Sequence, residues 1–111
     1  MKSICVPTSL DAMSRLDTDS CVDGDLVEIT LEQSDFDELR QSGLLGELNS
    51  SLSLLIDEFE DESISNGQLD SAITIYEKYA DTLNLNENKA AEIKDLFELA
   101  RSKNTGLFFF L

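Results

Sequence analysis

The chain has 111 residues, which is enough for one small domain with its own hydrophobic core. It contains 23 Asp and Glu, 8 Lys and Arg and no His, so its formal net charge at pH 7 is −15. This balance argues against nucleic acid and anionic membranes as direct ligands, because both are bound by clustered basic side chains. The lack of His removes the commonest general base and the commonest zinc ligand.

The first part of the chain is predicted to hold two strands separated by a short helix. Residues 2–6 alternate between apolar and other side chains up to a proline, which is typical of a strand. Apolar residues then recur at helical spacing over 9–16, and the polar, acid-rich stretch 17–25 predicts a turn-rich loop. Residues 26–31 are rich in β-branched side chains and predict the second strand.

Two helices are predicted in the middle of the chain. Ser34 is an N-cap residue with Asp37 three positions later, and the helix that it opens is expected to end near Ser42, before a glycine. From Leu44, leucine and isoleucine recur every three or four residues as far as Phe59. This apolar stripe predicts a second helix that ends in an acidic run.

The last part of the chain is predicted to hold helices over 68–83 and 87–103, the latter capped by Asn86, and a terminal strand over 107–111. An exposed strand of three phenylalanines would promote aggregation, so we expect it to lie inside the sheet between the two N-terminal strands. The predicted fold is α+β, with three to four helices on a small mixed sheet of about three strands that includes both terminal segments. We expect a single domain over 1–111.

The cysteine content and the N-terminus indicate a cytoplasmic protein. The segment before Pro7 is too short and too weakly apolar for a secretory signal. We therefore expect Cys5 and Cys21 to be reduced and buried or half-buried, although their number leaves one disulfide open. The longest apolar run, 107–111, is far shorter than the ~20 residues that a membrane span needs.

The net charge belongs to the first two thirds of the chain. Residues 1–77 contain 18 acidic and three basic residues, whereas 78–111 contain five of each. Such self-repulsion lowers stability, so the acids serve either as a solvated face or as a surface for a basic partner. They gather in a predicted loop (Asp17, Asp19, Asp23, Asp25, Glu28), at the start of a predicted helix (Asp35, Asp37, Glu38) and at the end of the next (Asp57, Glu58, Glu60, Asp61, Glu62).

The third group is the main candidate binding site. Acids at the C-terminal end of a helix repel one another and oppose the helix dipole, and a basic partner would relieve both effects. The predicted partner-binding residues are Asp57, Glu58, Glu60, Asp61 and Glu62, with Asp35, Asp37, Glu38, Asp23 and Asp25 as a second patch. Phe36 and Phe59 lie among these acids, and their helical spacing predicts that both face the core.

The loop 17–28 partly fits a calcium-binding loop. Acids stand at its first, third, ninth and twelfth positions: Asp17, Asp19, Asp25 and Glu28. Cys21 and Val22, however, stand where the loop needs an oxygen ligand and a glycine. A solvated or partner-facing loop is the preferred interpretation, and no metal or cofactor is predicted.

The sequence lacks the recognisable parts of an enzyme. Its serines and cysteines have no histidine to activate them, and it has neither a glycine-rich phosphate loop nor a Cys-x-x-Cys motif. Its carboxylates lie in polar runs, where nothing pushes the pKa values of a pair apart. We therefore expect a non-catalytic protein.

An early strand, dense acids in the middle and a glycine followed by an aromatic terminal strand resemble the small immunity proteins of bacterial contact-dependent inhibition and related polymorphic toxin systems. The segments that carry this resemblance are Ser34-Asp35-Phe36-Asp37-Glu38-Leu39, the acidic stretch from Leu52 to Glu62, and Thr105-Gly106-Leu107-Phe108-Phe109-Phe110. The resemblance implies a tight one-to-one complex with a cognate basic toxin domain, often a nuclease, whose active site is blocked.

Three functions remain open from the sequence. The leading hypothesis is an immunity protein that neutralises a basic toxin domain through its acidic surface. The alternative is an acidic nucleic-acid mimic or adaptor that binds a basic host protein with the same carboxylates. A calcium-binding module is the less favoured third possibility.

Overall fold

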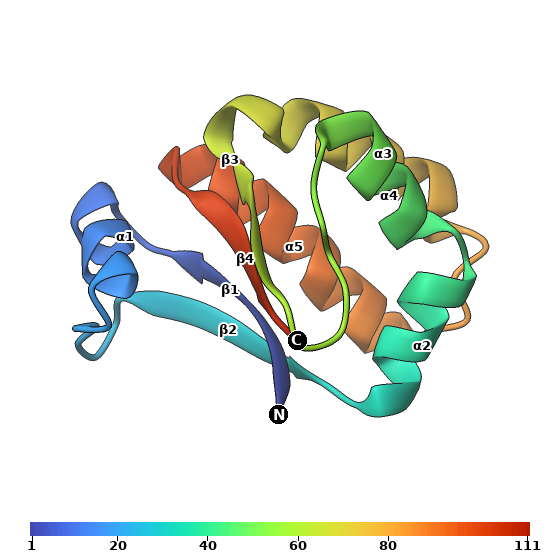
Figure 1. The fold of residues 1–111 in the computed structure, drawn as a ribbon, viewed down its shortest axis with the longest axis horizontal. Coiled ribbons are helices and arrows are strands. Elements are labelled where there is room, and N and C mark those ends of the chain that lie inside the picture. The colour runs from blue at the N-terminus through green and yellow to red at the C-terminus, as the bar shows by residue number, and fades with distance from the viewer.

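The computed structural model describes residues 1–111 and confirms the α+β class, with five α-helices and one four-stranded sheet (Figure 1). The elements in chain order are β1 (Lys2–Pro7), α1 (Leu10–Asp17), β2 (Leu26–Leu31), α2 (Gln33–Gln41), α3 (Leu44–Leu52), β3 (Asp61–Ser65), a 3-10 turn (Asn66–Gln68), α4 (Leu69–Ala80), α5 (Glu87–Lys103) and β4 (Gly106–Phe110). None of the helices has the length and apolar character needed to cross a bilayer.

The sheet has the strand order β2-β1-β4-β3, and every neighbouring pair is antiparallel. The expectation of three to four helices on a mixed sheet of about three strands is therefore wrong in helix number, strand number and strand direction. Both terminal strands do belong to the sheet, and β4 is an inner strand as predicted. Its second neighbour, however, is β3 rather than β2.

The core lies between the sheet and a layer of helices in which α5 packs across β1, β4 and β2 (Figure 1). One cluster of 21 buried residues fills this space, with Ile4 and Phe109 contributed by the inner strands. Across the layer of helices, the rings of Tyr76 and Phe97 lie 5.2 Å apart, a tilted aromatic pair. Helix α1 packs on β1 and lies at one end of the sheet, away from the other helices (Figure 1).

Strand β3 lies in the segment where the sequence predicts the acidic end of a helix. Helix α3 stops at Leu52, and Ser53 has a left-handed backbone with φ of 56°. The chain then returns along the sheet, and β3 covers the edge of the phenylalanine-rich β4. Gly106 permits this pairing, since a Cβ there would lie 2.9 Å from the Ile64 carbonyl oxygen. Cross-strand pairing thus overrides the helical periodicity of the segment.

The predicted helix boundaries hold best where a local cap determines them. Helix α5 occupies the predicted range, and the Asn86 side chain accepts a hydrogen bond from Asn88 N at 2.8 Å. Helix α2 begins two residues earlier than predicted, because Glu32 is its N-cap rather than Ser34. The Asp35 carboxylate accepts a hydrogen bond from the backbone N–H of Glu32 at 2.9 Å, which completes a capping box.

Candidate binding surface

Residues 53–60 form a loop that runs from α3 back along the sheet to the start of β3, close to both chain termini (Figure 1). The Asn49 side chain holds the loop to α3, because its amide accepts from Ile56 N at 2.7 Å and donates to Ile56 O at 3.1 Å. On the other side, the Glu62 carboxylate accepts a hydrogen bond from Leu55 N at 2.9 Å. The first half of this loop, at Leu55 and Ile56, is therefore held to both α3 and β3.

Phe59 stands near the end of this loop and is 89% exposed. Its φ is +64°, a left-handed backbone that costs an L-residue about 1–2 kcal/mol. The prediction that Phe59 faces the core is wrong, because the helix on which that prediction depends ends at Leu52. The matching prediction for Phe36 is confirmed, since that side chain is fully buried.

Two basic residues pair with the main acidic group, and one of them, Arg40, also pairs with an acid of α2. Lys2 Nζ lies 3.1 Å from a Glu58 carboxylate oxygen. The Arg40 guanidinium lies 3.6 Å from Glu58 and 3.7 Å from both Asp57 and Asp37. Asp37 of the second predicted patch and the main acidic group therefore meet at Arg40, and part of the negative charge of these acids is neutralised within the chain.

Cation–π contacts connect Lys2 with both phenylalanines. Lys2 Nζ lies 5.2 Å from the ring centre of Phe36 and 5.5 Å from that of Phe59. Arg40 also lies over the Phe36 ring, at 5.1 Å. Sequence reasoning did not assign Lys2 and Arg40 to the site. Their rarity was the available signal, since they are two of only three bases in the first 77 residues.

The other carboxylates of the two patches differ in whether their side chains have a partner within the chain. Glu60 and Asp61 are exposed, and their side chains have no hydrogen-bond or ion-pair partner within the chain. The Glu62 carboxylate accepts hydrogen bonds from the backbone N–H groups of Leu55 and Ser63, and the Asp35 carboxylate accepts one from that of Glu32. Glu60 and Asp61, on either side of the point where β3 begins, are thus the acids of this loop best placed to meet another molecule.

Beside Phe59 the surface is hollowed over about 490 Å³. The hollow is lined by the Phe59 ring, by Met1 and Lys2, by the C-terminal Leu111 and by the end of β2 with the residues that follow it. Met1 and Phe59 both expose their apolar side chains here. We call the exposed acids and aromatic ring of residues 57–61 the Phe59 surface: an apolar anchor among carboxylates at one end of the sheet.

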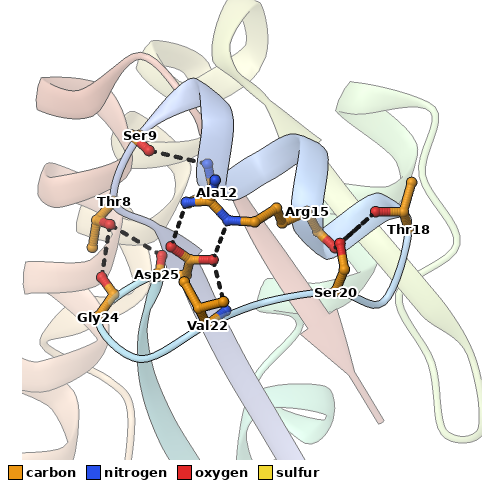
Figure 2. Close-up of polar contacts among 9 residues, drawn as sticks. All are labelled: Thr8, Ser9, Ala12, Arg15, Thr18, Ser20, Val22, Gly24 and Asp25. Atoms are coloured by element: carbon orange, nitrogen blue, oxygen red, sulfur yellow. Dashed lines mark hydrogen bonds and ion pairs between the residues drawn. The ribbon is translucent and has the colours of Figure 1, made fainter.

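Asp25 is not part of any exposed patch, because it is held by Arg15 (Figure 2). The carboxylate accepts two hydrogen bonds from the Arg15 guanidinium, both of 2.7 Å, and a third from Val22 N at 2.9 Å. Asp25 is only 5% exposed. The hydrogen bonds from Arg15, followed by that from Val22, lower the pKa of Asp25 to about 2. The Asp25 carboxylate is therefore bound within the chain and is not presented at the surface with the other predicted partner-binding acids.

The loop that contains Asp25 closes around this contact. Thr8 Oγ1 donates to the carbonyl oxygens of Gly24 (2.9 Å) and Asp25 (3.1 Å), which ties the loop to the end of β1 (Figure 2). Asp23 is exposed. It precedes β2, whereas the hollow beside Phe59 lies at the far end of that strand. The structure does not bring Asp23 together with the other predicted site residues.

The acids of the possible calcium loop are not gathered around one point. Asp25 is ion-paired with Arg15, while Glu28 lies on β2 opposite Cys5. No three His, Cys, Asp or Glu side chains are placed to hold a metal ion together. The geometry of this loop is accounted for by the Arg15–Asp25 contact.

The two thiols lie in different environments. Cys5 is buried in β1 between Glu28 and Phe108 of the neighbouring strands, and burial raises its pKa to about 12. Cys21 is exposed, so the expectation that both thiols are at least half-buried is wrong for this residue. Both cysteines are free.

Comparison with known proteins finds no family model, curated protein or solved structure that matches this chain. The resemblance to bacterial immunity proteins therefore stays a prediction.

Proposed function

We propose that this chain is a non-catalytic binding protein that captures a basic protein domain through the Phe59 surface. The observation that carries the proposal is the exposure of Phe59, in a strained backbone conformation, beside two carboxylates without a partner in the chain. An aromatic side chain of this kind supplies contact area for a partner, and such residues are enriched among those that dominate binding energy.

The surrounding charge suits the same role. A net charge of −15 attracts a basic domain over long range and speeds its association, particularly at low salt. Once the partner is bound, burial of Phe59 would slow dissociation. The charge thus favours encounter with the right class of partner, and the aromatic ring favours retention.

The partner that we propose is a cytoplasmic toxin domain, bound one to one, and the chain would be its immunity protein. Two considerations support this choice: the resemblance in sequence organisation, and the match between acidic side chains and the basic, phosphate-binding groove of a nuclease. Carboxylates of the Phe59 surface would occupy positions that substrate phosphates otherwise take.

The test is to co-express the chain with the C-terminal domain encoded by the adjacent upstream open reading frame. We expect a one-to-one complex that protects cells from that domain and that weakens as salt rises. Absence of both binding and protection would contradict the proposed toxin partner. Specific capture of housekeeping nucleic-acid-binding proteins instead would favour the nucleic-acid mimic.

A further inference from the structure

The two edge strands of the sheet differ in how their outward backbone groups are satisfied. Just before β3, Leu111 N donates to Glu60 O, so by alternation Asp61, Ser63 and Ser65 turn their N–H groups outward. Two of the three are occupied: Ser63 N donates to the Glu62 carboxylate at 2.8 Å, and Ser65 N donates to the Gln68 side chain at 3.1 Å. Side chains of the chain itself therefore block most of the outward N–H groups of this edge.

Strand β2 has an open edge. Thr8 N donates to Asp25 O at 2.8 Å, which sets the alternation along β2 so that Leu26, Glu28 and Thr30 turn their backbone groups away from β1. Lys89 Nζ donates to Thr30 O at 2.6 Å, which agrees with this direction. No side chain or loop backbone bonds to the outward groups of Leu26 and Glu28. In Figure 1, no element lies beyond β2 on this side.

An apolar hollow lies beside the open edge, between β2 and α5. It has a volume of about 320 Å³. Val27 and Ile29 line it from β2, Leu96 and Leu99 line it from α5, and Glu92 and Asp95 complete the lining. Val27 is 42% exposed, so the side-chain contacts of this strand are incomplete on the side that faces the helix.

We propose that an extended, basic segment of the partner adds to the sheet as a fifth strand on β2. Its backbone would bond to the outward groups of Leu26 and Glu28, and an apolar side chain would fill the hollow. Because side chains of a strand alternate, the residues between would point to the other face, toward Glu28. This inference rests on the proposed function, which supplies a basic partner.

The charges select this occupant over a second copy of the chain. Symmetric antiparallel pairing of two β2 strands would place the acids beside the edge, Glu28 among them, close to those of the other copy. Each copy also carries a net charge of −15. A segment with Lys or Arg at alternate positions turns the same acids into favourable contacts.

The probe is the acetylated and amidated peptide Lys-Val-Lys-Val-Lys-Val-Lys, added at low salt to the isotope-labelled chain. In the free chain the Glu28 amide should exchange with solvent fast, while those of Val27 and Ile29 exchange slowly. With saturating peptide, we expect the exchange rate of the Glu28 amide to fall to about one tenth of its value in the free chain or lower, because the amide gains a backbone hydrogen bond. Unchanged exchange at Glu28 would overturn the proposal, whether or not the peptide binds elsewhere.

Two variants separate the backbone from the charge. Glu28→Pro removes the carboxylate together with the outward N–H, whose loss an edge strand tolerates, and should weaken peptide binding about tenfold. Glu28→Gln keeps the amide and should weaken it only about two- to threefold. An equal loss of peptide affinity in both variants would overturn the proposal that the peptide bonds to the Glu28 backbone. Should Glu28→Pro lose the protection of Val27 and Ile29, the exchange measurement on the unmodified chain decides alone.

The peptide assay does not use the captured domain. Failure of the peptide to protect Glu28 would therefore overturn the added strand and leave the proposed function standing. Protection of Glu28 by the peptide, with no basic partner captured, would overturn the proposed function alone.

Discussion

Phe36 and Phe59 have nearly the same sequence surroundings and opposite positions in the structure. Each is preceded and followed by an acid, and each ring lies within 5.5 Å of Lys2 Nζ. Phe36 is nevertheless fully buried in α2, while Phe59 is 89% exposed in the loop before β3. The comparison teaches that neighbouring acids do not decide whether an aromatic side chain is buried. The secondary structure of the segment that contains the residue decides it. One ring stabilises the fold, and the other is exposed on the surface that we propose for a partner.

The largest expected effect is on the stability of the fold. Phe36→Ala should lower the free energy of unfolding by about 3–5 kcal/mol, because it removes a fully buried ring from the core. Phe59→Ala should change it by no more than about 0.5 kcal/mol, as for other exposed side chains. Chemical denaturation of both variants measures the difference. Similar losses in the two would contradict the opposite roles assigned to the rings.

A second effect concerns the rate of partner binding. The double variant Glu60→Lys, Asp61→Lys should lower the association rate about tenfold at low salt, because it reverses the two free carboxylates beside Phe59. The matched control Glu77→Lys, Asp81→Lys makes the same change of net charge on α4 and the residue after it, where both acids are exposed. Stopped-flow kinetics at two salt concentrations separates them. Equal slowing in both variants would assign the effect to net charge alone.

A third prediction contrasts Asp25, whose charge is used within the chain, with the free acids of the Phe59 surface. Contact with Arg15 lowers the pKa of Asp25 from 3.8 to about 2. A lowered folded-state pKa means that the stability from this contact is fully present above about pH 4 and is lost as the pH falls toward 2. The stability difference between the unmodified chain and Arg15→Gln should therefore shrink over this pH range. A difference that stays constant down to pH 2 would contradict the assignment.

The smallest effect is the relief of backbone strain at Phe59. Phe59→Gly should leave the free energy of unfolding unchanged or raise it by up to about 1 kcal/mol, because glycine adopts the left-handed backbone without strain while gaining freedom in the unfolded chain. Thermal unfolding measures this. A clear loss of stability would mean that the exposed ring supports the fold.

The parts of the fold that local sequence could predict are those with local causes. Helix α5 has its Asn86 cap, and β1 ends at a proline. Strand β3 escaped prediction because Asp, Glu and Ser have low strand propensity, and the segment becomes a strand only through its pairing with β4. The exposure of Phe59 depends on that same long-range pairing, so the local sequence around Phe59 does not predict it either.

The candidate site was predictable in composition but not in arrangement. Asp57, Glu60 and Asp61 are exposed, yet Asp25 is buried against Arg15, ten residues earlier in the chain. Likewise, the contact between Lys2 and Glu58 joins residues far apart in the sequence. Which acids are neutralised within the chain and which stay free depends on such tertiary pairs, and charge patterning along the sequence does not contain them.

The most direct test of the Phe59 surface is the affinity of the captured basic domain for the unmodified chain and for Phe59→Ala, measured by calorimetry beside thermal unfolding of both. We expect equal stability and a dissociation constant raised about 30-fold, as for a residue that contributes about 2 kcal/mol to binding. An unchanged dissociation constant, with both proteins folded, would contradict the assignment of Phe59 as the anchor of the binding surface.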